Sequence, residues 1–144
     1  MRAADVAWDG SIARGNGVAT ASSSGAFALP ISLPSRIADP GGETSPEELL
    51  AAAHAGCFAT SIGGEIARAG GTVVRIDVRC TVTMDEVEGK GHQVVSSELD
   101  VTAQAEGIDE AGFARATEAA DAGCSFSSLI RASASVSVSA TLAS

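Results

Sequence analysis

The sequence predicts an α+β protein with the element order β-β-β-α-β-β-α-β, and three patterns support that class. Apolar and polar residues alternate strictly over 73–84 and over 132–142, as they do in strands that bury one face. A capped and almost wholly apolar stretch over 46–68 predicts a long buried helix. Glycine and small polar residues separate these stretches, so we expect tight turns and antiparallel strands.

The beginning of the chain predicts three short strands followed by a loop. Within 2–33, the pair Asp9-Gly10 and the Ser-Ser-Ser-Gly run at 22–25 are hairpin signals. Prolines and glycines over 34–42 predict a loop without regular structure.

A helix start follows this loop. Ser45 is a suitable N-cap, Pro46 fits the first helical position, and Glu48 completes the pattern of a capping box. Between residues 49 and 62 the helix presents no polar face, which predicts burial on every side. A chain of 144 residues has few elements with which to cover such a helix, so we expect a homodimer.

The rest of the chain predicts a strand hairpin, a second helix and a closing strand. Asp109 is a suitable N-cap for that helix. The expected strand, strand, helix, irregular segment and strand occupy 73–84, 93–105, 109–123, 124–131 and 132–142. Because no linker or repeat interrupts the chain, we expect one domain over 1–144.

Charge and composition exclude several classes of partner. The net charge is −9 and the nine Lys and Arg residues form no cluster, which argues against nucleic acid and anionic membranes. The N-terminus has no apolar segment of a signal peptide, and no apolar run reaches membrane-spanning length. Three cysteines do not make a disulfide framework, so a reducing cytoplasm is the expected location.

Cys57 is the residue whose chemistry decides the function. A free cysteine in an apolar helix is either inert core or a shielded redox nucleophile. The second interpretation needs a cation, because burial alone raises the pKa of a thiol. His54 lies one turn earlier on the same face, but a hydrogen-bonded core histidine is the simpler interpretation. Arg36 is the better candidate, since it keeps its charge when partly buried.

Glu47 cannot reach Cys57 along their common helix. Ten residues separate the two, about 15 Å at the α-helical rise. Glu47 either complements the helix dipole, holds an arginine that contacts the thiol, or serves the Cys57 of a second copy.

The other cysteines differ in their settings. Cys124 follows a helix end and begins a serine-rich segment, where a resolving thiol has the mobility that it needs. Cys80 shares the apolar face of a strand and is expected to be inert core. The cysteines and His54 show no short ligand spacing, which argues against a metal site.

Three ordered blocks of the chain resemble the OsmC/Ohr family of thiol-dependent hydroperoxide reductases, and its OsmC branch in particular. The first block is the WDGSIARGNG run at 8–17. The second is TSPEELLAAAHAGCF at 44–58, which is similar to the family's first-cysteine motif. The third joins Gly-Ile-Asp at 107–109 with Ala-Gly-Cys at 122–124, where the family carries its second cysteine.

The resemblance implies a role for four residues. Cys57 corresponds to the peroxidatic cysteine and Cys124 to the resolving cysteine. Arg36 matches the arginine that activates the thiolate, and Glu47 matches the glutamate that holds that arginine. The implied fold is OsmC-like, with antiparallel sheet strands packed on two main helices in an intertwined homodimer.

The implied activity is a cysteine-based peroxidase in oxidative stress defence. It reduces organic hydroperoxides, with hydrogen peroxide as an open second substrate. Cys57 forms a sulfenic acid, Cys124 condenses with it, and an external dithiol, for which the resemblance suggests a lipoyl protein, reduces the disulfide. No metal, haem or flavin cofactor is implied.

The sequence leaves other points open. The chain departs from the family pattern at Ser125, where the family usually has proline, and we expect a less rigid loop and an altered rate of resolution. Two non-enzymatic alternatives are a small-ligand-binding protein and a zinc-binding protein of the same fold. Both cysteines together with Arg36 and Glu47 favour the enzyme.

Overall fold

The computed structural model describes residues 1–144 and divides them into two compact units, 1–49 and 50–144. The expectation of one domain over the whole chain stays a prediction. None of its helices is both long and apolar enough to cross a membrane.

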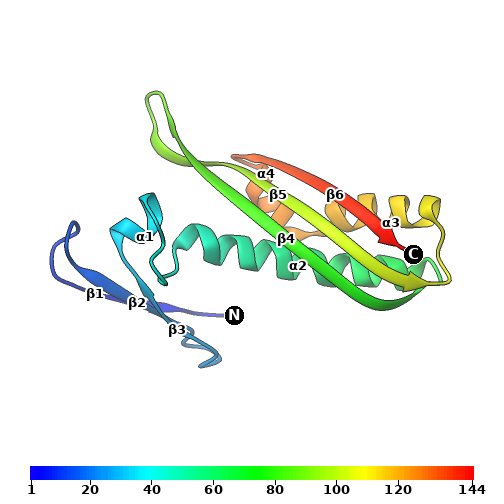
Figure 1. Ribbon diagram of the computed structural model, residues 1–144, viewed down its shortest axis with the longest axis horizontal. Helices are drawn as coiled ribbons and strands as arrows, with labels where there is room; N and C mark the ends of the chain where they lie inside the picture. The colour runs from blue at the N-terminus through cyan, green and yellow to red at the C-terminus, as the bar shows by residue number, and fades with distance from the viewer. The chain divides into compact units, whose positions relative to one another are not determined.

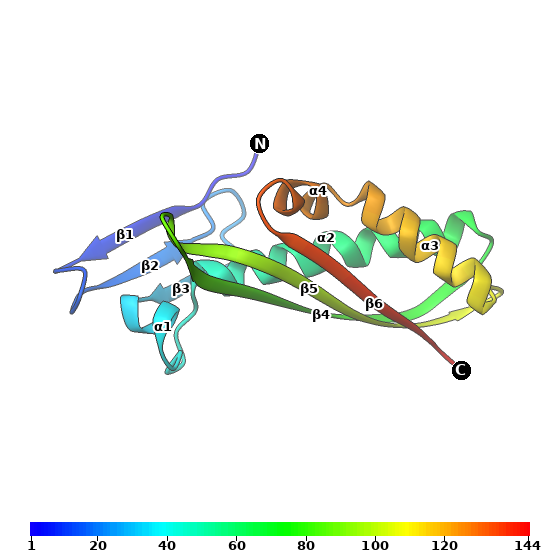
Figure 2. The same cartoon turned by 90° about the horizontal axis from the view of Figure 1, so that it is seen from above.

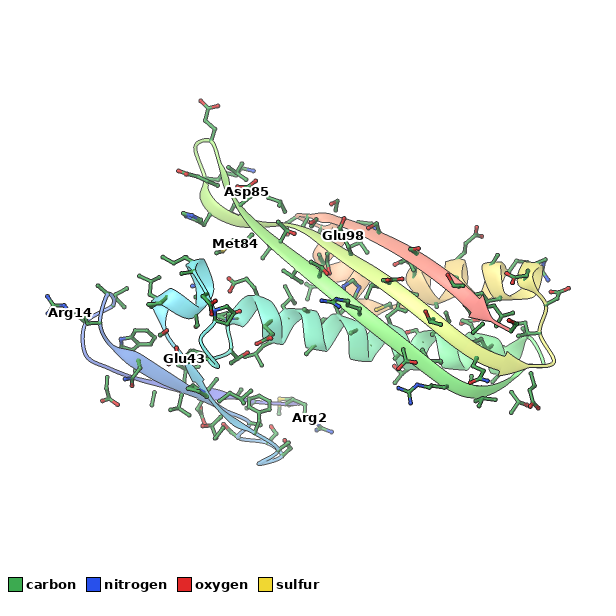
Figure 3. All side chains as sticks on the ribbon, viewed as in Figure 1. Arg2, Arg14, Glu43, Met84, Asp85 and Glu98 are labelled. Carbon is green, nitrogen blue, oxygen red and sulfur yellow. The ribbon has the colours of Figure 1, made fainter.

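The first unit is built on a three-stranded antiparallel sheet. Strands β1 (Asp5–Asp9), β2 (Asn16–Thr20) and β3 (Ala28–Ile31) pair in chain order (Figure 1). This confirms the three predicted strands. Gly10 adopts a φ of 88° in the first turn, a left-handed conformation that favours glycine. Arg14 lies exposed in the same loop (Figure 3).

The sequence predicted a loop over the whole segment 34–42. This is wrong for its beginning, which belongs to helix α1 (Leu33–Ile37). Ser32 caps this helix in a reciprocal pair with Ser35, which satisfies free backbone N–H groups at the helix start. Proline is tolerated in a first helical turn, so Pro34 does not prevent the helix. The Ser32–Ser35 cap therefore allows a short helix in a segment that the proline marked as a loop.

Helix α2 (Pro46–Arg68) has the predicted bounds. The Ser45 hydroxyl accepts from the Glu48 N–H at 3.1 Å, which confirms the N-cap. The Glu48 carboxylate accepts from the Thr44 hydroxyl at 2.7 Å instead of closing the predicted box.

The second unit contains a sheet of three long strands. β4 (Thr72–Val87) pairs antiparallel with β5 (Gly91–Glu106), and β6 (Ser135–Ala143) lies on the other side of β5. The expectation of antiparallel strands is confirmed for β4 and β5. It is wrong for β5 and β6, which are parallel. Two helices connect β5 to β6, and such a helical crossover brings the chain back to start its next strand at the same end of the sheet.

Helices α3 (Glu110–Gly123) and α4 (Ser125–Arg131) form this crossover. Asp109 caps α3 by accepting from the Gly112 N–H at 2.7 Å, as predicted. The segment 124–131 was expected to be irregular, and that prediction is wrong. Cys124 ends α3 and also serves as the N-cap of α4, so a single extended residue separates two helices.

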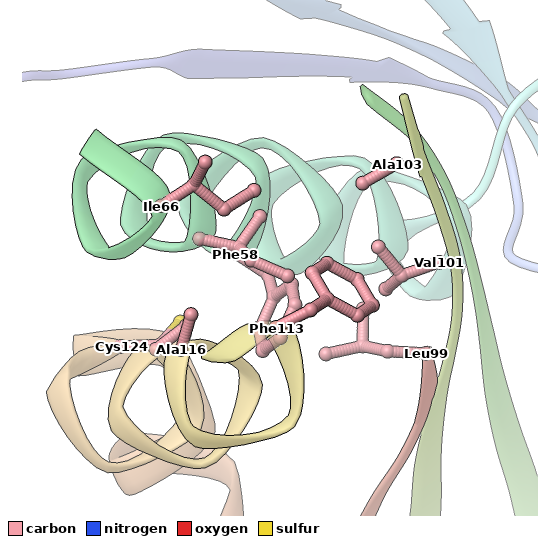
Figure 4. Packing of buried hydrophobic residues seen from close by; sticks show 10 residues of the cluster. Phe58, Ile66, Leu99, Val101, Ala103, Phe113, Ala116 and Cys124 are labelled. Atoms are coloured by element: carbon pink, nitrogen blue, oxygen red, sulfur yellow. The ribbon is translucent and has the colours of Figure 1, made fainter. Parts of the chain in front are cut away.

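The core of the second unit lies between its sheet and its helices (Figures 1 and 2). From α2 a row of side chains spaced four residues apart points inward, and the central strand β5 contributes every second residue. Figure 4 shows Phe58 and Phe113 between the helices and the strand residues Leu99 and Val101. The second cysteine, Cys124, is fully buried and belongs to this core.

Helix α2 is not buried on every side within one chain. Its fully buried residues form a single stripe, His54, Phe58, Ile62 and Ile66. Ala52, Gly56 and Thr60 are exposed on other faces, although the sequence offers no strongly polar face there. The predicted complete burial is therefore not met by the chain alone.

Candidate active site

Cys57 and Cys124 lie in contact. Their Sγ atoms are 3.1 Å apart, and the Cys124 thiol is placed to donate to the Cys57 sulfur. A disulfide needs about 2.05 Å, so a shift of about 1 Å joins the two sulfurs. Cys57 comes from the middle of α2, and Cys124 comes from the junction of α3 and α4. Both cysteines are free.

Hydrogen-bond donors at the start of α4 face the Cys57 sulfur. Burial alone would raise the pKa of Cys57, but donors from the Phe126 N–H, the Cys124 thiol, and the Ser125 hydroxyl and N–H outweigh burial and lower it. The Ser125 Oγ lies 3.8 Å from the Cys57 Sγ. Cys57 therefore ionises more readily than an ordinary cysteine.

Cys124 is buried, whereas Cys57 is partly exposed. The Cys124 sulfur accepts from the Ser127 N–H at 3.5 Å, in the position that a serine or aspartate oxygen takes at most helix starts. Cys57, the more accessible thiol, is thus the one whose ionised form is stabilised, and the buried Cys124 thiol lies beside it.

His54 is a hydrogen-bonded core residue, as the simpler interpretation predicted. It is fully buried, and its Nδ1 and Nε2 lie 2.7 Å from Ser97 Oγ and 2.8 Å from Ser127 Oγ. Burial lowers the pKa of His54, so the ring is neutral near pH 7. It does not supply a positive charge to Cys57. Its contact with Ser127 instead ties α4 to α2.

Cys80 lies in a different environment. Its Sγ is 3.2 Å from Ser97 Oγ and 3.8 Å from His54 Nδ1. Burial raises the pKa of Cys80, and the Ser97 contact only partly opposes this shift. The thiol stays protonated near neutral pH, in line with its expected place at the core.

Arg36 and Glu47 form an ion pair in the first unit. Arg36 reaches both carboxylate oxygens, with Nη2–Oε1 at 2.6 Å and Nε–Oε2 at 3.3 Å. Burial would raise the pKa of Glu47, but the hydrogen bonds and the charge of Arg36 outweigh it and lower the pKa. The pairing that the sequence suggested for these two residues is present. Such a two-point contact fixes the orientation of the guanidinium.

Nowhere in the chain do three or more His, Cys, Asp and Glu side chains gather in a way that could hold a metal ion.

Sequence reasoning named Ser125 only as a departure from the family pattern, and it missed two further serines of this site, Ser97 and Ser127. Ser125 and Ser127 belong to the first turn of α4, and Ser97 lies on β5 opposite His54. A serine-rich run directly after a helix end was the available signal, since serine favours the first turn of a helix. The partner of Ser97 was not predictable, because 43 positions separate it from His54.

The site is thus a pair of adjacent thiols, of which Cys57 has a lowered pKa. Comparison with known proteins shows which family the chain belongs to. The family model described as "OsmC-like protein" matches residues 39–139. The protein named Peroxiredoxin OsmC of Escherichia coli is 33% identical over 125 residues, covering 87% of this chain and 86% of that protein. The chain belongs to the OsmC-like family.

Solved structures share the fold at low sequence identity. The organic hydroperoxide resistance protein OsmC of Legionella pneumophila has a TM-score of 0.73 at 21% identity and 96% coverage of both chains. OhrB of Bacillus subtilis has a TM-score of 0.68 at 22% identity and 98% coverage of both. An OsmC-like protein of Vibrio cholerae reaches 0.79 at 12% identity, covering 98% of this chain and 99% of that one.

Proposed function

We propose that this protein is a cysteine-based peroxidase that reduces organic hydroperoxides through Cys57 and Cys124, in defence against oxidative stress. The observation that carries the proposal is the 3.1 Å contact between the two sulfurs, with donors that favour the thiolate on Cys57. A relative at 33% identity that is named a peroxiredoxin supports the same reaction class.

In the first step the Cys57 thiolate attacks one peroxide oxygen. The O–O bond breaks, the sulfur is oxidised to a sulfenic acid, and the alkoxide leaves and takes a proton to become the alcohol. Hydrogen peroxide would give water in the same way. A thiolate is required because the thiol form is a poor nucleophile.

In the second step Cys124 resolves the sulfenic acid. Its sulfur attacks the Cys57 sulfur, the S–O bond breaks, and the hydroxyl leaves as water with the Cys124 proton. The disulfide then takes two electrons from an external dithiol by thiol–disulfide exchange, for which we propose a lipoyl protein. Such a cycle fits a reducing compartment, and we propose the cytoplasm.

We propose that Arg36 and Glu47 also take part in the reaction. The bidentate pair holds a guanidinium in a fixed orientation, which would let it stabilise the thiolate electrostatically. We propose this role for Arg36, with Glu47 as its positioning residue.

We also propose that the protein works as a homodimer. The support is the set of small apolar residues on α2 that one chain leaves uncovered, together with the half-buried apolar face of the edge strand β4. A second copy would remove this surface from water.

Replacement of single cysteines tests the proposed activity. We expect Cys57→Ser to abolish peroxide reduction with a dithiol as electron donor, because serine cannot form the sulfenic acid. Cys80→Ser is the matched control and should keep nearly full activity, since Cys80 lies in the core network instead. The measurement is peroxide consumption under turnover. Full activity in Cys57→Ser would overturn the proposal.

A further inference from the structure

Ser125 stands where the sequence resemblance implies a proline, and its hydroxyl lies against the reactive sulfur of Cys57. It is the first helical residue of α4, directly after the N-cap Cys124. The N–H groups of the first helical turn have no partner within the helix, so they are free to bind an acceptor outside it. The Ser125 hydroxyl lies 3.8 Å from Cys57 Sγ.

We propose that Ser125 is a catalytic residue that donates its hydroxyl and its backbone N–H to the Cys57 sulfur, a contribution that a proline at this position cannot make. Proline has no N–H and no hydroxyl. The inference rests on the proposed function for the reaction that the thiolate performs, but the contact itself is independent of any peroxide.

The lowered pKa of Cys57 agrees with the contact between Ser125 Oγ and Cys57 Sγ. Both donations favour the charged form of the Cys57 sulfur, and they act together with the Phe126 N–H and the Cys124 thiol in lowering its pKa. Donors to a charged acceptor form stronger hydrogen bonds than donors to a neutral one. The serine thus adds two of the donors that oppose the effect of burial on Cys57.

The backbone would accept proline without refolding. Cys124 has φ −75° and ψ 113°, an extended conformation that suits a residue before proline. Proline is also favoured at the first helical position. Ser125→Pro therefore removes both donors while it keeps the helix, Ser125→Ala removes the hydroxyl alone, and Ser125→Thr keeps both.

The experiment measures the rate of Cys57 alkylation by iodoacetamide against pH in the reduced full-length protein, with peptide mass spectrometry to separate Cys57 from the other cysteines. We expect Ser125→Pro to move the profile to higher pH, because its thiolate is less stable. Nucleophilicity rises with pKa, so the rate should fall by about threefold at pH 6 and rise above wild type at pH 10. Ser125→Ala should show a smaller change in the same direction.

Two controls isolate the donors. Ser128→Ala alters an exposed serine of the same helix and should leave the profile unchanged, as should Ser125→Thr. Superimposable profiles in wild type, Ser125→Ala and Ser125→Pro would overturn the proposal. If Ser125→Pro lost its circular dichroism signal, the Ser125→Ala profile alone would decide. An unshifted alkylation profile in Ser125→Ala would show that the hydroxyl does not stabilise the Cys57 thiolate. None of these outcomes depends on peroxide turnover, so the proposed function is tested separately.

Discussion

Cys57 and Cys80 show how one kind of side chain acquires opposite acid strength from its surroundings. Each is partly buried and bonded to a serine, yet the pKa of Cys57 is lowered and that of Cys80 is raised. Cys57 lies against several donors at the start of α4, whereas Cys80 has one serine contact and the effect of burial. Cys57 has more donors and Cys80 is more deeply buried, and both differences separate the two thiols.

Arg36 carries the next prediction at this scale. If its charge stabilises the Cys57 thiolate, Arg36→Met should raise the pKa of that thiol, because a favourable opposite charge is lost. Less thiolate is then present below that pKa, so Cys57 oxidation should slow by about tenfold at pH 6 and little at pH 9. Stopped-flow oxidation by an alkyl hydroperoxide at both pH values measures this.

The companion variants sharpen the result. Glu47→Gln should produce the same change in weaker form, since Glu47 only orients the guanidinium. Arg2→Met removes an exposed positive charge from the same unit and should have no effect (Figure 3). Equal slowing of Arg36→Met at pH 6 and pH 9 would show that the arginine does not tune the thiol.

Single residues were predictable from the sequence where local chemistry reveals them. The thiol in an apolar helix and the caps Ser45 and Asp109 were found in this way. The contact between Cys57 and Cys124 joins positions 67 residues apart, and no local pattern encodes it. Only the resemblance to a family paired these cysteines.

Helix α4 is the element on which the site depends. Its first turn presents donors to Cys57, and its N-cap is the second cysteine itself. The His54 ring anchors the helix by bonding Ser127 on one side and Ser97 on the other. A buried, fully bonded imidazole holds its neighbours in place because every broken contact leaves a polar atom without a partner.

This anchor yields a prediction about stability. Ser127→Ala leaves the buried His54 Nε2 without its partner, so the free energy of unfolding should fall by about 1–3 kcal/mol. Urea unfolding followed by circular dichroism provides the measurement. Ser128→Ala, which alters the adjacent exposed serine, should change it by less than about 0.5 kcal/mol. Equal losses in the two variants would argue against the anchor.

At the scale of elements, the long helix and strands were predicted well, the three short strands were found from their hairpin signals, and the two short helices were missed. Helix α2 and the long strands carry many residues of one period, so their signals accumulate. Helices α1 and α4 have five and seven residues, too few for a periodic pattern. The parallel pairing of β6 depends on the direction in which the chain returns through α3 and α4, which alternation does not contain.

The whole molecule raises the question of the surface that α2 leaves uncovered. Within one chain only a single stripe of the helix is fully buried, and small residues occupy the rest of its middle section. Small residues permit close approach of a second helix. A homodimer formed on this surface would also account for the absence of a polar face over 49–62.

Dimerisation gives a prediction that mutation can sharpen. Light scattering at micromolar concentration should report twice the mass of 14.3 kDa. Gly56→Glu places a charge on an exposed part of α2 where an added Cβ meets no atom of its own chain. It should shift the mass toward the monomer without unfolding the chain, because burying a charge at a subunit contact is costly. A monomeric wild-type protein would contradict the proposed assembly.

In the proposed cycle Cys57 and Cys124 act as one redox pair, and the mass of the protein after a single oxidation shows whether they do. The reduced protein is treated with one equivalent of an alkyl hydroperoxide, blocked at its free thiols and digested. We expect the loss of two hydrogens, a peptide that links Cys57 to Cys124, and a Cys80 that carries only the blocking group. Cys124→Ser should instead carry one added oxygen on Cys57. An unlinked pair in the wild type, or a linkage that includes Cys80, would contradict the claim.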